Sequence, residues 1–132
     1  MNARVGLARW HDALAGKRDQ QALAALIGED AVFHSPVAHT PQTGRRLVAG
    51  YLAAAARTLG NADFHYVREL VNADTAVLEF ETMIDGVHIN GIDLIRFDEA
   101  GLIAEFKVMI RPLKAVNKVW EVMAGELKRQ PT

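Results

Sequence analysis

The region from residue 62 to residue 111 constrains the fold most, because apolar side chains recur there at every second position. Alternating segments cover residues 62–70, 78–84 and 87–97, and a last strand is expected over 103–111. Turn sequences lie between them, at 72–74, 85–86 and 98–101. A period of two is that of a β-strand, and the Asp-Gly pair at 85–86 is typical of a two-residue hairpin. The region therefore predicts a meander of long antiparallel strands.

Helical spacing of apolar residues occurs on both sides of this meander. The segments concerned lie at 7–14, 23–27, 48–59 and 113–127. Asp19 and Thr43 are the expected caps of the second and third helices, and Pro112 suits the first turn of the last. A short strand is expected over Ala31–Ser35, followed by a loop over 36–44. Helices grouped in this way are expected to cover one face of the sheet, which gives an α+β fold.

Length and composition favour one domain over residues 1–132, with a core large enough to stand alone. The chain lacks cysteine, which excludes disulfides, thiolate metal sites and a cysteine nucleophile. The net charge is -1 with no basic stripe, so a nucleic-acid partner is not expected. Apolar runs are far shorter than the ~20 residues that span a bilayer. We therefore expect no membrane segment and a cytoplasmic protein.

Asp93 is the most unusual residue of the predicted sheet. It shares a strand face with Ile89, Gly91 and Ile95, where a carboxylate costs free energy unless it is paired or protonated. Burial raises the pKa of a carboxyl group, and a neutral carboxyl can donate a hydrogen bond or act as an acid. The alternative is a structural partner such as Arg68. Gly91 indicates strand curvature or, less strongly, the close approach of another group.

Other side chains are candidates for the remainder of a site. We expect His34 to be the second polar group, although His34 and His39 lack the spacing of a metal site. In residues 64–70 we place Tyr66 and Leu70 on the apolar side and Glu69 on the polar side. The side chains expected to shape a pocket or to bind substrate are Trp10, Ser35, Tyr51, Phe64, Tyr66, Phe80 and Phe106.

Three stretches resemble the nuclear transport factor 2-like superfamily, which includes ketosteroid isomerases and SnoaL-like polyketide cyclases. The strongest is Gly-Ile-Asp-Leu-Ile-Arg-Phe-Asp-Glu-Ala-Gly-Leu-Ile at 91–103. The others are Ala-Val-Phe-His-Ser-Pro-Val at 31–37 and Arg-Trp-His-Asp-Ala-Leu at 9–14. The resemblance implies a cone-shaped, cystatin-like fold, in which a curved antiparallel sheet wraps around helices and encloses an apolar pocket.

The resemblance also implies roles for single residues. In ketosteroid isomerases a protonated Asp and a Tyr polarise the substrate oxygen, and another Asp moves the proton. Asp93 matches the polarising Asp, the base position falls on Ser35, and the Tyr position falls near Trp10. The implied function is therefore a retooled site rather than a steroid isomerase.

Three hypotheses follow. The first is a cofactor-independent isomerase, cyclase or dehydratase that takes a small apolar or amphipathic carbonyl compound and uses Asp93 as acid or acid/base. The second is a domain of the same fold that binds a ligand without chemistry. The third is a homodimerisation module, because Leu94 and Met109 share the outer sheet face with Arg96 and Lys107.

Overall fold

The computed structural model describes residues 2–16 and 18–129, and side chains as far as Glu126. Residues 1, 17 and 130–132 of the expected domain lie outside the described part. The elements are α1 (Asn2–Ala15), α2 (Gln20–Ala24), β1 (Ile27–His34), β2 (Gln42–Thr43), α3 (Arg45–Leu59), β3 (His65–Asn72), β4 (Thr75–Ile84), β5 (Val87–Phe97), β6 (Ile103–Arg111) and α4 (Leu113–Arg129).

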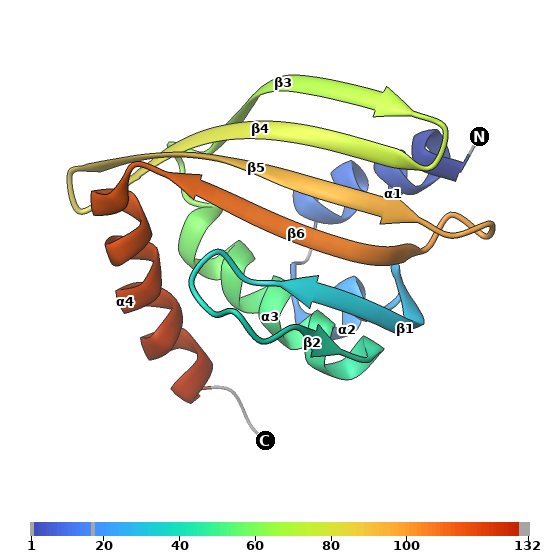
Figure 1. Cartoon of the computed structure of the whole chain (residues 1–132), viewed down its shortest axis with the longest axis horizontal. Helices are drawn as coiled ribbons and strands as arrows, with labels where there is room; N and C mark the ends of the chain where they lie inside the picture. Colours follow the sequence, from blue (N-terminus) through green and yellow to red (C-terminus); the bar gives the residue numbers. More distant parts are fainter. Residues whose placement is uncertain (1, 17, 130–132) are drawn as a thin grey trace.

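The six strands form one curved sheet in the order β2-β1-β6-β5-β4-β3 (Figure 1). Strands β3 to β6 are the antiparallel meander expected from the alternation. Asp85 and Gly86 both have positive φ, at 50° and 77°, as a two-residue hairpin of the Asp-Gly type requires. Strand β1 lies parallel to β6, so the sheet is mixed at this edge.

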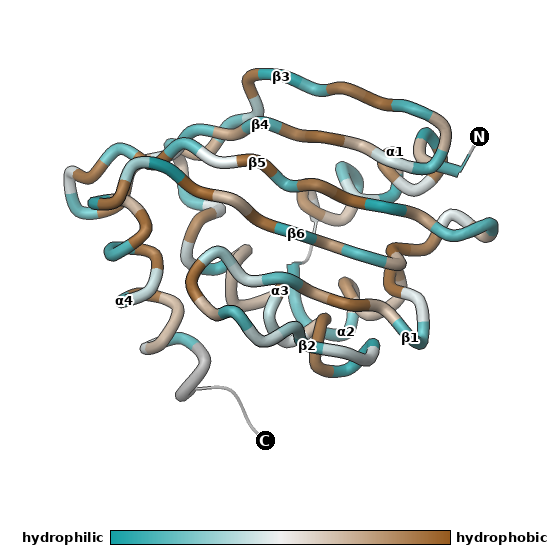
Figure 2. Tube along the Cα trace, viewed as in Figure 1, coloured by the Kyte–Doolittle hydropathy of each residue, from teal (hydrophilic) through white to brown (hydrophobic). Residues whose placement is uncertain are grey.

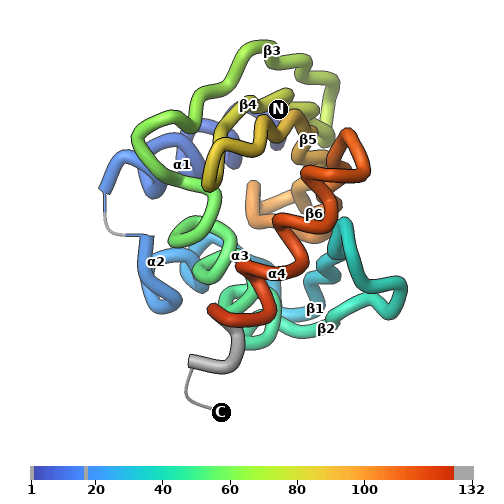
Figure 3. Tube along the Cα trace, turned by 90° about the vertical axis from the view of Figure 1, so that its left-hand side faces the viewer, coloured from blue at the N-terminus to red at the C-terminus, as the bar shows by residue number. Residues whose placement is uncertain are grey.

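Helices α1, α2 and α3 lie against the concave face of the sheet, which bends around them as an arc from β3 to β2 (Figure 3). Helix α4 packs against α3 at the end of the sheet (Figure 1). This arrangement confirms the expected α+β fold with a curved sheet around helices. None of the described helices is long and apolar enough to cross a membrane.

The core lies between the concave face and the helices. Hydrophobic and hydrophilic positions alternate along β4 and β5 (Figure 2), and the inward side chains of β5 are buried from Ile89 to Phe97 as predicted. Four phenylalanines are fully buried there: Phe33, Phe80, Phe97 and Phe106. Asp93 is 7% exposed in the same row, so it is a carboxyl group inside an aromatic core.

Several boundaries differ from the sequence predictions, and β1 runs from Ile27 to His34 rather than from Ala31 to Ser35. Ile27 belongs to β1 rather than to the second helix, because it pairs with Ile103 of β6. Thr43 belongs to β2, where it pairs with Val32, and Gly44 is the N-cap of α3 without a side-chain hydrogen bond. The expected cap at Asp19 is confirmed, since its carboxylate accepts a hydrogen bond from the Ala22 amide at 2.8 Å.

An irregularity in β3 changes which side chains point inward. Tyr66 lies opposite Phe80 but Arg68 lies opposite Glu79, so Val67 is an extra residue between two pairs. The extra residue reverses the alternation that follows it. Leu70 is therefore 61% exposed, and Glu69, opposite the buried Leu78, turns toward α1. The prediction that placed Leu70 inward and Glu69 outward was wrong for this reason.

Gly91 is explained by close packing. A Cβ atom there would lie 2.5 Å from Cζ of Phe80 and 2.7 Å from the Met109 carbonyl oxygen. The strand pairing continues without a register shift on both sides of this residue. The glycine therefore makes room for the Phe80 ring. Close approach of another group, the second of the two interpretations of Gly91, explains it.

Candidate functional site

A cavity of about 340 Å³ lies between α1, α3 and the concave face of the sheet. Its apolar wall includes side chains of α3 and three phenylalanines: Leu52, Ala55, Leu59, Phe64, Phe80 and Phe106. Exposed residues that line the cavity mark its opening, and they include Arg18, Asn61 and His65. The arrangement can surround a small, largely apolar molecule while leaving one end near solvent.

A chain of hydrogen bonds joins three of the residues that line this cavity. Trp10 of α1 donates from Nε1 to the Tyr66 hydroxyl at 3.1 Å. Tyr66 of β3 donates from that hydroxyl to Oδ2 of Asp93 on β5 at 3.0 Å. Three elements far apart in the sequence are thus joined through one hydroxyl group, that of Tyr66. Tyr66 cannot donate elsewhere while this bond persists, so its role is to hold Asp93.

The second oxygen of Asp93 is available to a ligand. Tyr66 occupies Oδ2, and Oδ1 has no hydrogen-bond partner among the residues that the structure describes. No fully buried side-chain oxygen or nitrogen in this part of the chain lacks a partner. Oδ1 must therefore be accessible, and the accessible space beside Asp93 is the cavity.

The surroundings favour the neutral form of Asp93. Desolvation by burial raises its pKa from 3.8 to about 7, although the hydrogen bond from Tyr66 acts in the opposite direction. The pKa of Tyr66 is also raised, first by burial and then by the negative charge of Asp93. The phenol is therefore neutral across the physiological range. Near pH 7 the site holds an acid that is poised to release its proton.

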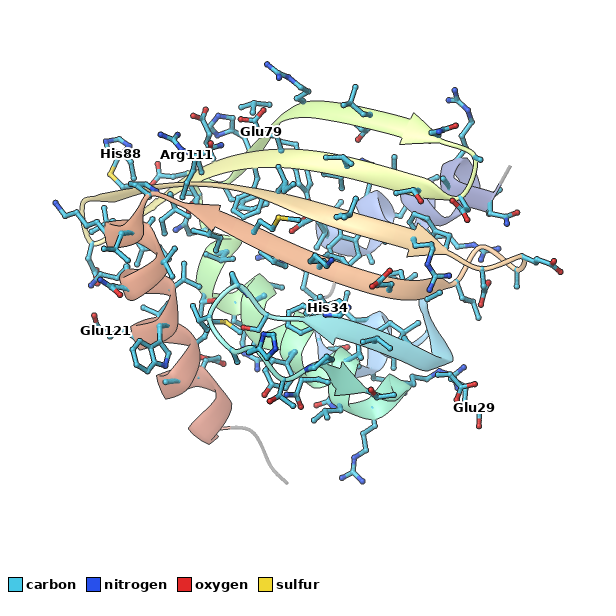
Figure 4. The ribbon with its side chains drawn as sticks, in the orientation of Figure 1. Glu29, His34, Glu79, His88, Arg111 and Glu121 are labelled. Carbon is cyan, nitrogen blue, oxygen red and sulfur yellow. The ribbon has the colours of Figure 1, made fainter. Side chains whose placement is uncertain are left out.

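The ion-pair alternative for Asp93 is contradicted. Nε of Arg68 lies 3.7 Å from a carboxylate oxygen of Glu79, and the Arg68 side chain is 71% exposed. The extra residue in β3 places Arg68 on the outer face of the sheet, where Figure 4 shows Glu79. Asp93 thus has a phenol rather than a guanidinium as its partner.

Most of the residues expected to shape a pocket line this cavity together with Asp93: Trp10, Phe64, Tyr66, Phe80 and Phe106. Tyr51 lies outside the lining and stacks on Phe33, with ring centroids 5.4 Å apart. His34 and Ser35 line a separate depression beside β6. Figure 4 labels His34 on β1. Nε2 of His34 lies 2.9 Å from Oε2 of Glu105. Oγ of Ser35 accepts a hydrogen bond from the Val37 amide.

The structure adds a second polar pair that the sequence reasoning missed. His11 lines the cavity, and its Nε2 atom lies 2.7 Å from Oε1 of Glu69. The His11 ring also meets Tyr66 edge-on, with ring centroids 5.7 Å apart. The position of His11 beside Trp10 was visible in the sequence, but the inward turn of Glu69 depends on the irregularity in β3. Within the described residues, no three potential metal ligands gather into a site.

Comparison with solved structures gives the fold and its relatives. The crystal structure of a steroid delta-isomerase from Pseudomonas aeruginosa is 39% identical, with a TM-score of 0.88, and the match covers 96% of this chain and 92% of that one. An uncharacterised protein with a cystatin-like fold from Silicibacter pomeroyi is 30% identical, with a TM-score of 0.85 over 95% and 86% of the two chains.

A more distant relative shares the fold alone. It is a hypothetical protein with a ketosteroid isomerase-like fold from Catenulispora acidiphila, 19% identical, with a TM-score of 0.62 over 84% and 88% of the two chains. A search of curated proteins finds no match. The model of the SnoaL-like domain matches residues 7–106. That match covers most of the chain, and the chain therefore belongs to the SnoaL-like domain family.

Proposed function

We propose that this protein is a cofactor-independent enzyme that polarises the carbonyl group of a small apolar compound, as an isomerase, cyclase or dehydratase does. The observation that carries the proposal is the buried Asp93, which has one carboxyl oxygen held by Tyr66 and the other accessible from an apolar cavity. An acid in such a place can donate a hydrogen bond to a carbonyl oxygen that gains negative charge.

The hydrogen-bond chain supports this role. As charge develops on the substrate oxygen, the proton on Oδ1 of Asp93 moves toward it, and the carboxyl group becomes negative. The hydrogen bond from Tyr66 stabilises that charge, and Trp10 holds the phenol in place. Because Trp10, Tyr66 and Asp93 bond to one another, the protein itself sets their positions, and little reorganisation is expected to accompany the reaction.

The relationship to a steroid delta-isomerase supports the reaction class. The proposal does not include steroids as substrates. The resemblance puts the base at Ser35, and Ser35 lines another depression. The proposal concerns removal of a proton from the carbon beside the carbonyl, a step that isomerisation, cyclisation and dehydration can share.

The test uses two matched probes. The ketone 2-tetralone loses a proton beside its carbonyl to form an enol, and 2-naphthol is a stable planar analogue of that enol. We expect the protein to bind 2-naphthol and to accelerate the exchange of 2-tetralone protons for deuterium in D2O, measured by NMR. Asp93→Leu should weaken 2-naphthol binding by about tenfold or more, since it removes the hydrogen bond between the carboxyl group and the oxygen of the bound 2-naphthol.

Asp12→Asn, an exposed change on α1, is the matched control and should behave as the parent. Retention of 2-naphthol without acceleration of exchange would contradict an enzymatic role and support a binding domain. Equal behaviour of Asp93→Leu and the parent would remove the basis of the proposal.

We also propose that a second copy of this chain covers the outer face of the sheet. Met109 is 44% exposed there, and Leu94 and Ile92 lie partly exposed on the same face. Apolar side chains beside charged ones suit a contact between two copies. Light scattering should give twice the mass of the chain at micromolar concentration, and a monomer would contradict this proposal.

A further inference from the structure

We infer that His11 is the base that takes the proton from the carbon beside the carbonyl, and that Glu69 orients it. The inference rests on the proposed function, because that reaction needs a base as well as the acid Asp93. Ser35 cannot supply one, since it lines another depression and its hydroxyl accepts hydrogen bonds from the amides of its own loop.

The residues that line the cavity restrict the choice. The titratable side chains among them are Asp93, Tyr66, Arg18, His11 and His65. Asp93 is the acid, Tyr66 remains protonated, and a guanidinium does not release its proton in proteins. Two imidazoles are left, and an imidazole can accept and release a proton near neutral pH.

Hydrogen bonding separates the two imidazoles. Nδ1 of His65 lies 3.0 Å from the carbonyl oxygen of Asp63, and its Nε2 lies 3.6 Å from Glu81. A neutral imidazole that donates from Nδ1 to the Asp63 carbonyl oxygen carries its lone pair on Nε2. In His65 this Nε2 atom lies toward Glu81, which does not line the cavity. His65 is also more exposed than His11, with side-chain exposures of 61% and 40%.

The pairing of His11 leaves one nitrogen free to act. A carboxylate is an acceptor only, so Glu69 accepts a hydrogen bond from the N–H group at Nε2 of His11 across their 2.7 Å contact. The neutral ring then carries its lone pair on Nδ1. When Nδ1 takes a proton, the negative charge of Glu69 stabilises the imidazolium. This is the relation between an orienting carboxylate and a catalytic histidine.

His11 is also close to the acid end of the site. Its ring touches the edge of Tyr66, and the hydroxyl of Tyr66 is bonded to Asp93. Asp93 and His11 both line the cavity, so a ligand that fills it would contact both side chains. The acid is contributed by β5 and the base by α1, so helix packing sets the distance between them.

His11 and Asp93 together account for both proton transfers of enol formation. Nδ1 of His11 takes the proton, and the electrons of the broken C–H bond form the C=C bond of the enol. The carbonyl π electrons move to oxygen, which receives the proton of Asp93. Return of a proton to carbon restores both side chains. Because His11 is partly exposed, its proton exchanges with water, and deuterium from D2O is expected in the ketone.

His11→Gln tests the assignment. It should lower the enzyme-dependent exchange rate of 2-tetralone by about 100-fold or more, the usual contribution of a general base. The affinity of this variant for 2-naphthol should change less than threefold, because Asp93 and Tyr66 are unchanged. His88→Gln is the matched control, since His88 is exposed at the far end of β5 (Figure 4) and should leave the rate unchanged.

Glu69→Gln gives an independent test of the orienting role. The ¹⁵N shifts of His11 should report the tautomer with hydrogen on Nε2 in the parent and a mixture in this variant, with a slower exchange rate. Should His11→Gln fail to fold, this variant decides the matter. A parental tautomer and a parental rate in Glu69→Gln would overturn the inference.

The two proposals fail in different ways. A folded His11→Gln variant that exchanges 2-tetralone at the parental rate would overturn only the assignment to His11. A parent protein that does not accelerate exchange would overturn the proposed function, and the role of His11 with it.

Discussion

Tyr66 donates its hydroxyl hydrogen to Oδ2 of Asp93 at 3.0 Å and so joins β3 to β5 inside the cavity. This bond explains how a carboxyl group persists in an aromatic core. It satisfies one oxygen without supplying a positive charge, so burial remains the dominant influence on the pKa of Asp93.

The stability of the protein should depend on the protonation of Asp93. Its pKa is raised from 3.8 in the unfolded chain to about 7 in the folded chain, so the folded state holds the proton more tightly. This contribution to stability is complete below pH 4 and is lost as the pH rises to 7. The loss is at most about 4 kcal/mol, from 1.36 kcal/mol for each pH unit.

Asp93→Asn removes this dependence, because an amide does not titrate in this range. We expect the unfolding free energy of the variant, measured in urea at several pH values, to increase relative to that of the parent as the pH rises from 4 to 8. Groups elsewhere in the chain contribute equally to both proteins and cancel in the comparison. A constant difference across the series would show that Asp93 does not titrate as the structure indicates.

Tyr66→Phe should raise the pKa of Asp93 further, because the hydrogen bond from Tyr66 is the interaction that lowers it. The variant should also lose about 1–3 kcal/mol of unfolding free energy at pH 8, where the buried carboxylate would lack its donor. NMR of the Asp93 carboxyl carbon and urea unfolding measure the two effects. Tyr51→Phe is the control, since Tyr51 contributes ring packing against Phe33 and should change neither quantity appreciably.

Gly91→Ala should destabilise the fold, because the added methyl group would meet the Phe80 ring at 2.5 Å and a backbone oxygen at 2.7 Å. Overpacking of this kind costs about 1–3 kcal/mol. Gly125→Ala in α4 is the matched control: nothing lies within 4 Å of the added atom, and the helix should gain up to about 1 kcal/mol. Equal thermal midpoints for the two variants would contradict the packing explanation.

The order of the elements and the inward row of β5 could be predicted because they depend on local patterns. Alternation and the Asp-Gly turn specify the meander, and Asp93 stands out within a regular strand. Boundaries that depend on partners distant in the sequence could not be predicted in this way. Ile27 fits a helix or a strand by its neighbours alone, and its pairing with Ile103 decides between them.

The site was predictable in part for the same reason. Tyr66 precedes the irregularity in β3 and lies on the expected side, whereas Glu69 follows it and does not. One extra residue, Val67, thus separates Arg68 from Asp93 and brings Glu69 to His11. No period-two pattern signals such a residue, because its position depends on how β3 pairs with β4.

Asp93 is a buried acid held by a neutral phenol, and this arrangement should be visible in the titration of its carboxyl group. The carboxyl carbon of Asp93, labelled with ¹³C and assigned through Asp93→Asn, can be followed by NMR from pH 4 to 9. We expect a transition near pH 7. A transition near the ordinary value of about 3.9 would contradict this expectation, because the group would then be an ordinary carboxylate throughout the physiological range.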